Sequence, residues 1–95
     1  MKFTFKGKIW LYQGAGPWHF VTIDEKTSQK IKESQKGKKR VGWGSIRVTA
    51  SLGKTSWNTS IFPNKDGTYI LPLKLEVRQK EAVAHGDMVK ISCSF

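Results

Sequence analysis

The feature that most restricts the fold of this chain is a short-range alternation of apolar and polar residues that recurs along its length. In residues 3–11, Phe3, Phe5, Ile9 and Leu11 fall at alternate positions, and Lys6 and Lys8 lie between them. Residues 46–52 and 87–95 alternate in the same way. A period of two places one set of side chains on one face of a β-strand. We therefore predict a mainly β protein.

The remaining elements follow from composition and turn residues. Residues 18–23, 55–62 and 69–71 are rich in β-branched and aromatic residues, which predicts three more strands. Pro72 ends the last of these and leads into a short helix over residues 75–84, which Gly86 stops. Asp24 is a suitable N-cap for another helix that ends near Gly37.

A strand–helix–strand unit therefore occurs twice in 95 residues, which are enough for one domain. Either unit alone would leave strand edges exposed, and closing a barrel removes them. We predict a single domain over residues 1–95, a small closed β-barrel of six to seven strands. It has two short helices and pseudo-two-fold β-α-β halves.

The first helical segment, residues 24–36, has an unusual composition. Ile31 is its only large apolar side chain. One apolar anchor gives a helix little surface to bury against a core, because helices in proteins are stabilised mainly by such a face. We expect this helix to be mobile or partly frayed.

The charge of the chain is strongly positive, with 17 Lys and Arg against 7 Asp and Glu and a net charge of +10. Seven basic residues fall between residues 26 and 40, where Glu33 is the one acid. Such a segment can neutralise phosphates and release their counterions, which favours nucleic acid or another polyanion as partner. The alternative is a solvated charged surface. The predicted anion-binding residues are Lys30, Lys32, Lys36, Lys38, Lys39 and Arg40.

Four tryptophans are many for a chain of this size. On a barrel they can stack against bases or line a pocket, or they can fill the core of a small domain. Trp43, Trp57 and Trp18 are the predicted stacking or pocket residues, with Trp43 first.

The residues that carry catalysis in other proteins are sparse here. His19 and His85 are the two histidines, and the single cysteine, Cys93, alternates with apolar neighbours as a buried thiol does. One cysteine excludes an internal disulfide. No stretch approaches the roughly 20 apolar residues of a membrane helix. We predict a cytoplasmic protein that is not an enzyme and has no metal site, cofactor or membrane span.

A series of short motifs resembles a known family. They are Gly44-Ser45-Ile46, Thr59-Ser60-Ile61-Phe62-Pro63, Asp66-Gly67-Thr68-Tyr69, Leu71-Pro72-Leu73-Lys74 and Gly86-Asp87-Met88-Val89. In this order they resemble the domain-of-unknown-function family numbered 1905, over nearly the whole chain. That family occurs alone or fused to a bacteriocin-protection segment of the YdeI/OmpD-associated type. The resemblance implies a small β-barrel with helices across its openings, and it supplies no activity and no site residues.

These observations together predict a non-enzymatic binding module that contacts an anionic partner such as nucleic acid through its basic segment. Two alternatives stay open: a barrel that binds a small apolar ligand between its aromatic side chains, and a protein-interaction accessory domain.

Overall fold

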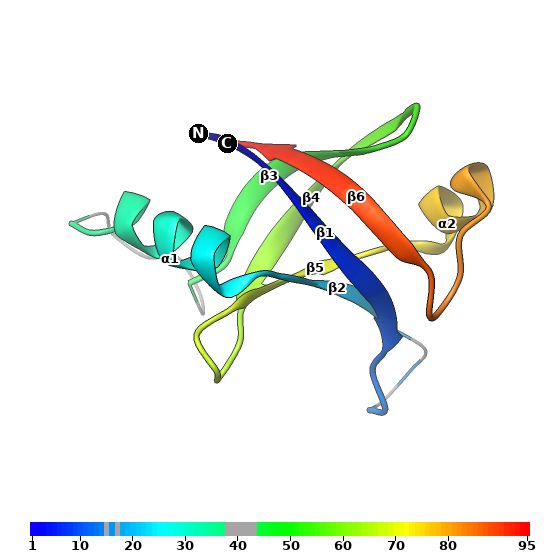
Figure 1. Ribbon diagram of the computed structural model, residues 1–95, viewed down its shortest axis with the longest axis horizontal. Coiled ribbons are helices and arrows are strands. Elements are labelled where there is room, and N and C mark those ends of the chain that lie inside the picture. The colour runs from blue at the N-terminus through cyan, green and yellow to red at the C-terminus, as the bar shows by residue number, and fades with distance from the viewer. Residues whose placement is uncertain (15, 17, 38–43) are drawn as a thin grey trace.

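A computed structural model describes every residue of the chain except 15, 17 and 38–43. The described residues form six strands and two helices (Figure 1). In chain order these are β1 (Lys2–Leu11), β2 (His19–Ile23), α1 (Glu25–Ser34), β3 (Ile46–Leu52), β4 (Thr55–Pro63), β5 (Tyr69–Pro72), α2 (Leu75–Glu81) and β6 (Met88–Ser94).

The strands close into a barrel in which each pairs antiparallel with two neighbours, in the order β1-β2-β5-β4-β3-β6. Closure depends on β1, whose residues 2–8 pair with β6 and whose residues 9–11 pair with β2. Gly7 lies near the point where β1 changes its partner from β6 to β2. A Cβ atom at this position would come within 2.7 Å of Val21 Cγ1, so the close approach of the strands requires glycine. The predicted closed barrel is thus confirmed, with six strands.

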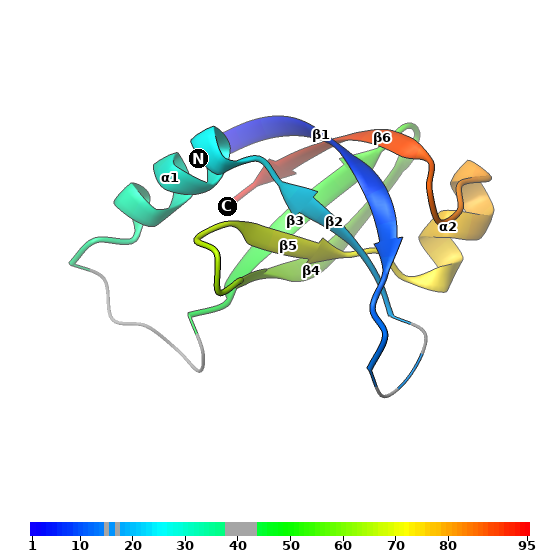
Figure 2. The same cartoon turned by 60° about the horizontal axis from the view of Figure 1, so that its bottom comes forward.

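The topology also repeats. The chain consists of two units with the same element order, β1-β2-α1-β3 and β4-β5-α2-β6. If each strand is replaced by its counterpart in the other unit, every pair of neighbouring strands in the barrel remains a pair of neighbours. The two helices accordingly lie at opposite ends of the barrel (Figures 1 and 2). The pseudo-two-fold halves expected from the sequence agree with this arrangement.

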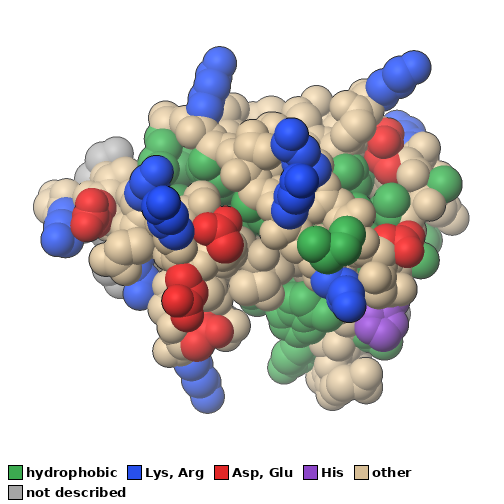
Figure 3. Space-filling model, viewed as in Figure 1, with side chains coloured by type: hydrophobic (Ala, Val, Ile, Leu, Met, Phe, Trp, Pro, Cys, Tyr) green, Lys and Arg blue, Asp and Glu red, His purple; other side chains and the backbone are tan. Residues whose placement is uncertain are grey.

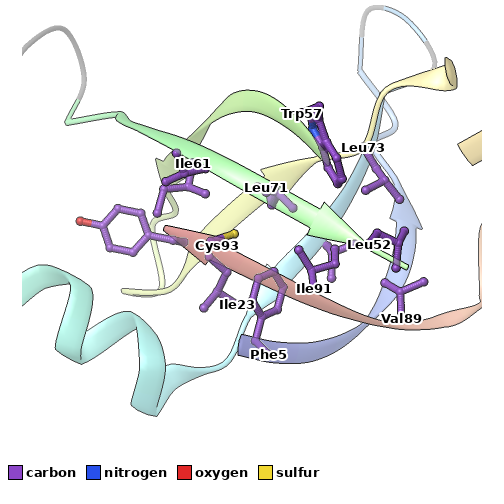
Figure 4. Packing of buried hydrophobic residues seen from close by; sticks show 14 of the residues in the cluster. Phe5, Ile23, Leu52, Trp57, Ile61, Leu71, Leu73, Val89, Ile91 and Cys93 are labelled. Carbon is purple, nitrogen blue, oxygen red and sulfur yellow. The ribbon is translucent and has the colours of Figure 1, made fainter. Parts of the chain in front are cut away.

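The inward positions of the strands build one apolar core (Figure 4). Each strand contributes alternate residues, and each helix adds one apolar side chain, Ile31 from α1 and Val77 from α2. Cys93 belongs to this core, and burial raises the pKa of its thiol to about 12. The thiol therefore stays protonated at neutral pH.

Helix α1 is held more firmly than its composition suggests. Ile31 is fully buried, and Ser28 gives the helix a second, polar attachment. The Ser28 hydroxyl donates to the Ile23 carbonyl at 3.0 Å and accepts from the Tyr69 N–H at 3.0 Å. Ser28 is thus a polar anchor that the sequence analysis, which counted only apolar side chains, did not include.

The ends of both helices have identifiable causes. The Asp24 carboxylate accepts the Thr27 N–H at 2.9 Å, which caps α1 and lowers the pKa of Asp24. Helix α2 is shorter than predicted, because Ala82 adopts a left-handed conformation with φ of 54° and ends it after Glu81. Neither described helix is long and apolar enough to cross a membrane.

Candidate functional site

The outward positions of β1 carry a row of basic side chains. Lys2, Lys6 and Lys8 share this face and are exposed, and Lys6 lies directly opposite the exposed Lys90 of β6. We call these four residues the lysine stripe. Like charges at opposite positions of neighbouring strands destabilise a sheet. None of the four forms an ion pair within the described part of the chain, so the stripe retains its positive charge.

Farther along the same face of β1 the side chains become aromatic. Trp10 lies opposite Phe20 of β2, which lies opposite Pro72 of β5. In the next row Ile70 of β5 lies opposite Phe62 of β4. With Tyr12 and Trp18 at its end, this surface forms a hollow of about 350 Å³, here called the aromatic groove. Its lining residues are Trp10, Tyr12, Trp18, Phe20, Phe62, Asn64, Ile70 and Pro72.

The rings of the aromatic groove are ordered around Phe20. Trp10 lies 5.2 Å from it between centroids, Trp18 is stacked at 6.4 Å with an interplanar angle of 17°, and Tyr12 meets it edge-on at 6.2 Å. The Trp10 Nε1–H donates to Thr22 Oγ1 at 2.9 Å, which fixes its indole against the sheet. These contacts hold the rings in place before any ligand arrives.

The outer members of the aromatic groove are open to solvent. Trp18 is 56% exposed, Tyr12 49% and Phe62 37%. In Figure 3 hydrophobic side chains gather at the lower edge of the molecule, beside the β1–β2 connection. Contiguous exposed apolar surface of this kind marks a binding site more often than single exposed residues do.

A second hollow of about 330 Å³ adjoins the first and shares Trp18 and Pro72 with it. Its lining is mainly apolar but includes Asn58, Lys74 and Arg78, and we call it the basic hollow after the last two. Arg78 Nε donates to the Leu73 carbonyl at 3.1 Å, which orients the guanidinium. Trp18 therefore borders both the aromatic groove and the basic hollow.

The residues predicted to bind anions are divided by the structure. Lys30 lies exposed on α1 and Lys36 in the turn after it. Lys32 is half-buried, with its ammonium against Gly67 in the β4–β5 turn. Acidic side chains lie among the basic ones over α1 in Figure 3. The predicted residues Lys38, Lys39 and Arg40 lie outside the described residues.

Asp66 is one of the carboxylates near α1. Hydrogen bonds from the Thr68 hydroxyl and N–H, at 2.6 and 2.9 Å, lower the pKa of Asp66, and the charge of Lys32 adds to this effect. The Lys32 charge is thus partly balanced within the protein.

The predicted stacking residues also differ in their positions. Trp18 is exposed and borders both hollows, as a stacking residue must. Trp57 is 7% exposed and belongs to the core, and it also lines the basic hollow, so of the two predicted roles its position fits a pocket residue better than a stacking one. Trp43 lies outside the described residues.

Sequence reasoning missed Trp10, Tyr12, Phe20 and Phe62. The signal was available, since Trp10 falls between the inward positions Ile9 and Leu11 of one alternating strand. Large apolar residues at outward positions are the pattern that would have found the aromatic groove.

No three His, Cys, Asp or Glu side chains among the described residues are placed to hold a metal ion.

The fold and its surfaces define a small barrel, closed by one chain and capped by a helix at each end, with basic and aromatic side chains on its outer face. A family model matches residues 5–92, nearly the whole chain, and its description is a domain of unknown function, DUF1905. The protein belongs to this family. A search of the curated proteins found no match.

Proposed function

We propose that this protein is a non-enzymatic module that binds nucleic acid on the outer face of its barrel. The lysine stripe contacts phosphates, and the aromatic groove extends the contact surface. A positively charged track beside aromatic side chains is the usual construction of proteins that bind nucleic acid without reading its sequence.

The observation that carries this proposal is the position of both surfaces on one strand. Lys6, Lys8 and Trp10 are successive outward positions of β1, so each lies about 7 Å from the next along the strand, and Tyr12 follows just after its end. A polyanion that follows this strand meets charge first and then apolar surface. The unpaired charge at Lys6 and Lys90 adds to this argument, because a bound phosphate relieves their repulsion.

The basic segment predicted from sequence remains part of the proposal as a second cationic surface. Of its described lysines, Lys26, Lys30 and Lys36 are exposed and Lys32 is half-buried. Its contribution can be separated from that of the lysine stripe, because the two sets share no residue.

The test measures retention on heparin and on random oligonucleotides as a function of salt. Replacing Lys6, Lys8 and Lys90 with glutamate should abolish retention at low salt. With the corresponding glutamine variants, the salt dependence of oligonucleotide binding should fall in slope by about 2, or about 0.7 for each lost phosphate contact with a single strand. In a parallel variant Lys36, Lys38, Lys39 and Arg40 are replaced with glutamate. Its loss of retention gives the contribution of the basic segment to binding.

The matched control reverses Lys54, Lys65 and Lys80, which are exposed outside the lysine stripe and the basic segment. It has the same net charge as the variant of the lysine stripe. If the control loses as much retention, only net charge matters and the proposed surface is wrong. Binding by the native protein that is insensitive to salt would also contradict it.

A small apolar ligand is the second candidate, and the aromatic groove is the observation that favours it. Such a ligand would change tryptophan fluorescence in a screen of apolar compounds, whereas oligonucleotides would leave it unchanged. The barrel interior is filled with side chains, so this candidate too depends on the outer surface.

A further inference from the structure

We infer that the aromatic groove and the basic hollow together hold one nucleotide of a single strand, with its base in the groove and its phosphate in the hollow. This inference rests on the proposed function and names the form of nucleic acid that the site takes. Trp18 is its central residue, because it borders both compartments.

The aromatic groove has the chemistry that an unpaired base requires. Its volume of about 350 Å³ lies within the range of small-molecule sites, which is about 300–1,000 Å³. The exposed rings of Trp18 and Tyr12 offer aromatic surface beside the fixed ring of Phe20. Stacking on such rings accepts every base, since each base has a π-face.

The basic hollow supplies the complementary charge. Lys74 is exposed at its rim, and Arg78 is oriented by its bond to the Leu73 carbonyl. The other guanidinium nitrogens of Arg78 make no hydrogen bond within the described part of the chain. Arginine and lysine held beside an aromatic platform suit a phosphate that adjoins a stacked base.

The location of the groove favours single strands over duplexes. It is a hollow on the outer face of a sheet, formed by side chains of β1, β2, β4 and β5. In a duplex the bases are stacked on one another and would have to be pulled out at a cost of a few kcal/mol before reaching these rings. A single strand presents its bases without this cost.

The experiment measures binding of fluorescent oligo(dT) and of a duplex of equal length across a salt series. Trp18→Ala and Phe62→Ala should each weaken oligo(dT) binding by about 5- to 150-fold and leave the salt slope unchanged. Trp18→Phe should restore most of the affinity, because it keeps an aromatic ring. Arg78→Gln should instead reduce the slope by about 0.7.

Met88→Ala is the matched control, because Met88 is 64% exposed and borders neither hollow. It should bind as the native protein does. Equal affinity of the native protein for duplex and single strand, or unchanged affinity in Trp18→Ala and Phe62→Ala, would overturn the inference and leave the proposed function standing. If the native protein binds neither nucleic acid, the proposed function fails as well. Sedimentation of free protein as a dimer that Trp18→Ala dissociates would identify a second copy as the occupant and overturn the inference.

Discussion

Two outer faces of the same barrel differ sharply. On the side of β6, β3, the start of β4 and the first half of β1, short polar side chains form a hydroxyl face of Thr4, Ser92, Thr49, Ser51 and Ser56. On the side of β2, β5 and the second half of β1 lies the aromatic groove. Both faces cover one common core.

The hydroxyl face is satisfied by its own hydrogen bonds. Thr4 meets Ser92 at 3.0 Å and Ser51 meets Ser56 at 2.8 Å across neighbouring strands, and Thr49 donates to Asn58 at 3.0 Å. The aromatic groove leaves apolar rings in contact with water. The comparison shows that the alternating pattern determines which side chains are buried. The residues at the outward positions then indicate where a partner can bind.

The largest expected effect is the difference in stability loss between an inward and an outward substitution in β5. Leu71 is fully buried, and the adjacent Ile70 belongs to the aromatic groove. Leu71→Ala should lower the free energy of unfolding by about 2–5 kcal/mol through lost burial and the cavity it leaves. Ile70→Ala should cost less than about 1.5 kcal/mol, because its site is half-exposed. Urea denaturation measures both, and equal losses would contradict the assignment of inner and outer positions.

A smaller effect should distinguish a buried hydroxyl from one on the hydroxyl face. Ser28→Ala removes the bridge between Ile23 and Tyr69 and should destabilise the fold by about 1–3 kcal/mol. Ser51→Ala should change stability by no more than about 0.5 kcal/mol, because water replaces its partner there. Thermal unfolding of the pair provides the comparison. If Ser28→Ala is as stable as Ser51→Ala, α1 is not held by this bridge.

The smallest effect concerns the lysine stripe. Lys6→Glu replaces a like-charge pair with an opposite-charge pair opposite Lys90 and should stabilise the barrel by about 0.2–1 kcal/mol at low salt. The gain should shrink as ionic strength rises, because exposed charges are screened. Lys54→Glu in the β3–β4 hairpin loop is the control. A gain independent of salt would show that charge is not its cause.

Much of the fold could be predicted because the alternation and Pro72 are local signals, whereas Gly86 lies beyond the end of α2, which Ala82 sets. The attachment of α1 could not, since nothing local indicates that Ser28, a polar residue, is buried with two hydrogen bonds. The functional surface was predicted in part. The net charge predicted a basic surface, and Trp18 was among the predicted stacking residues. The aromatic groove as a whole could not be predicted, because its residues come together only when the strands pair in the order of the closed barrel.

The most direct test of this account is a map of backbone amide NMR shifts during titration with oligo(dT) at low salt. We expect the largest changes at Tyr12, Trp18, Phe20 and Phe62, with weaker changes along Lys6 and Lys8, and none at Thr49 or Ser51 of the hydroxyl face. Shifts confined to the hydroxyl face, or none anywhere at saturating oligonucleotide, would contradict the assignment of the aromatic groove as the binding surface.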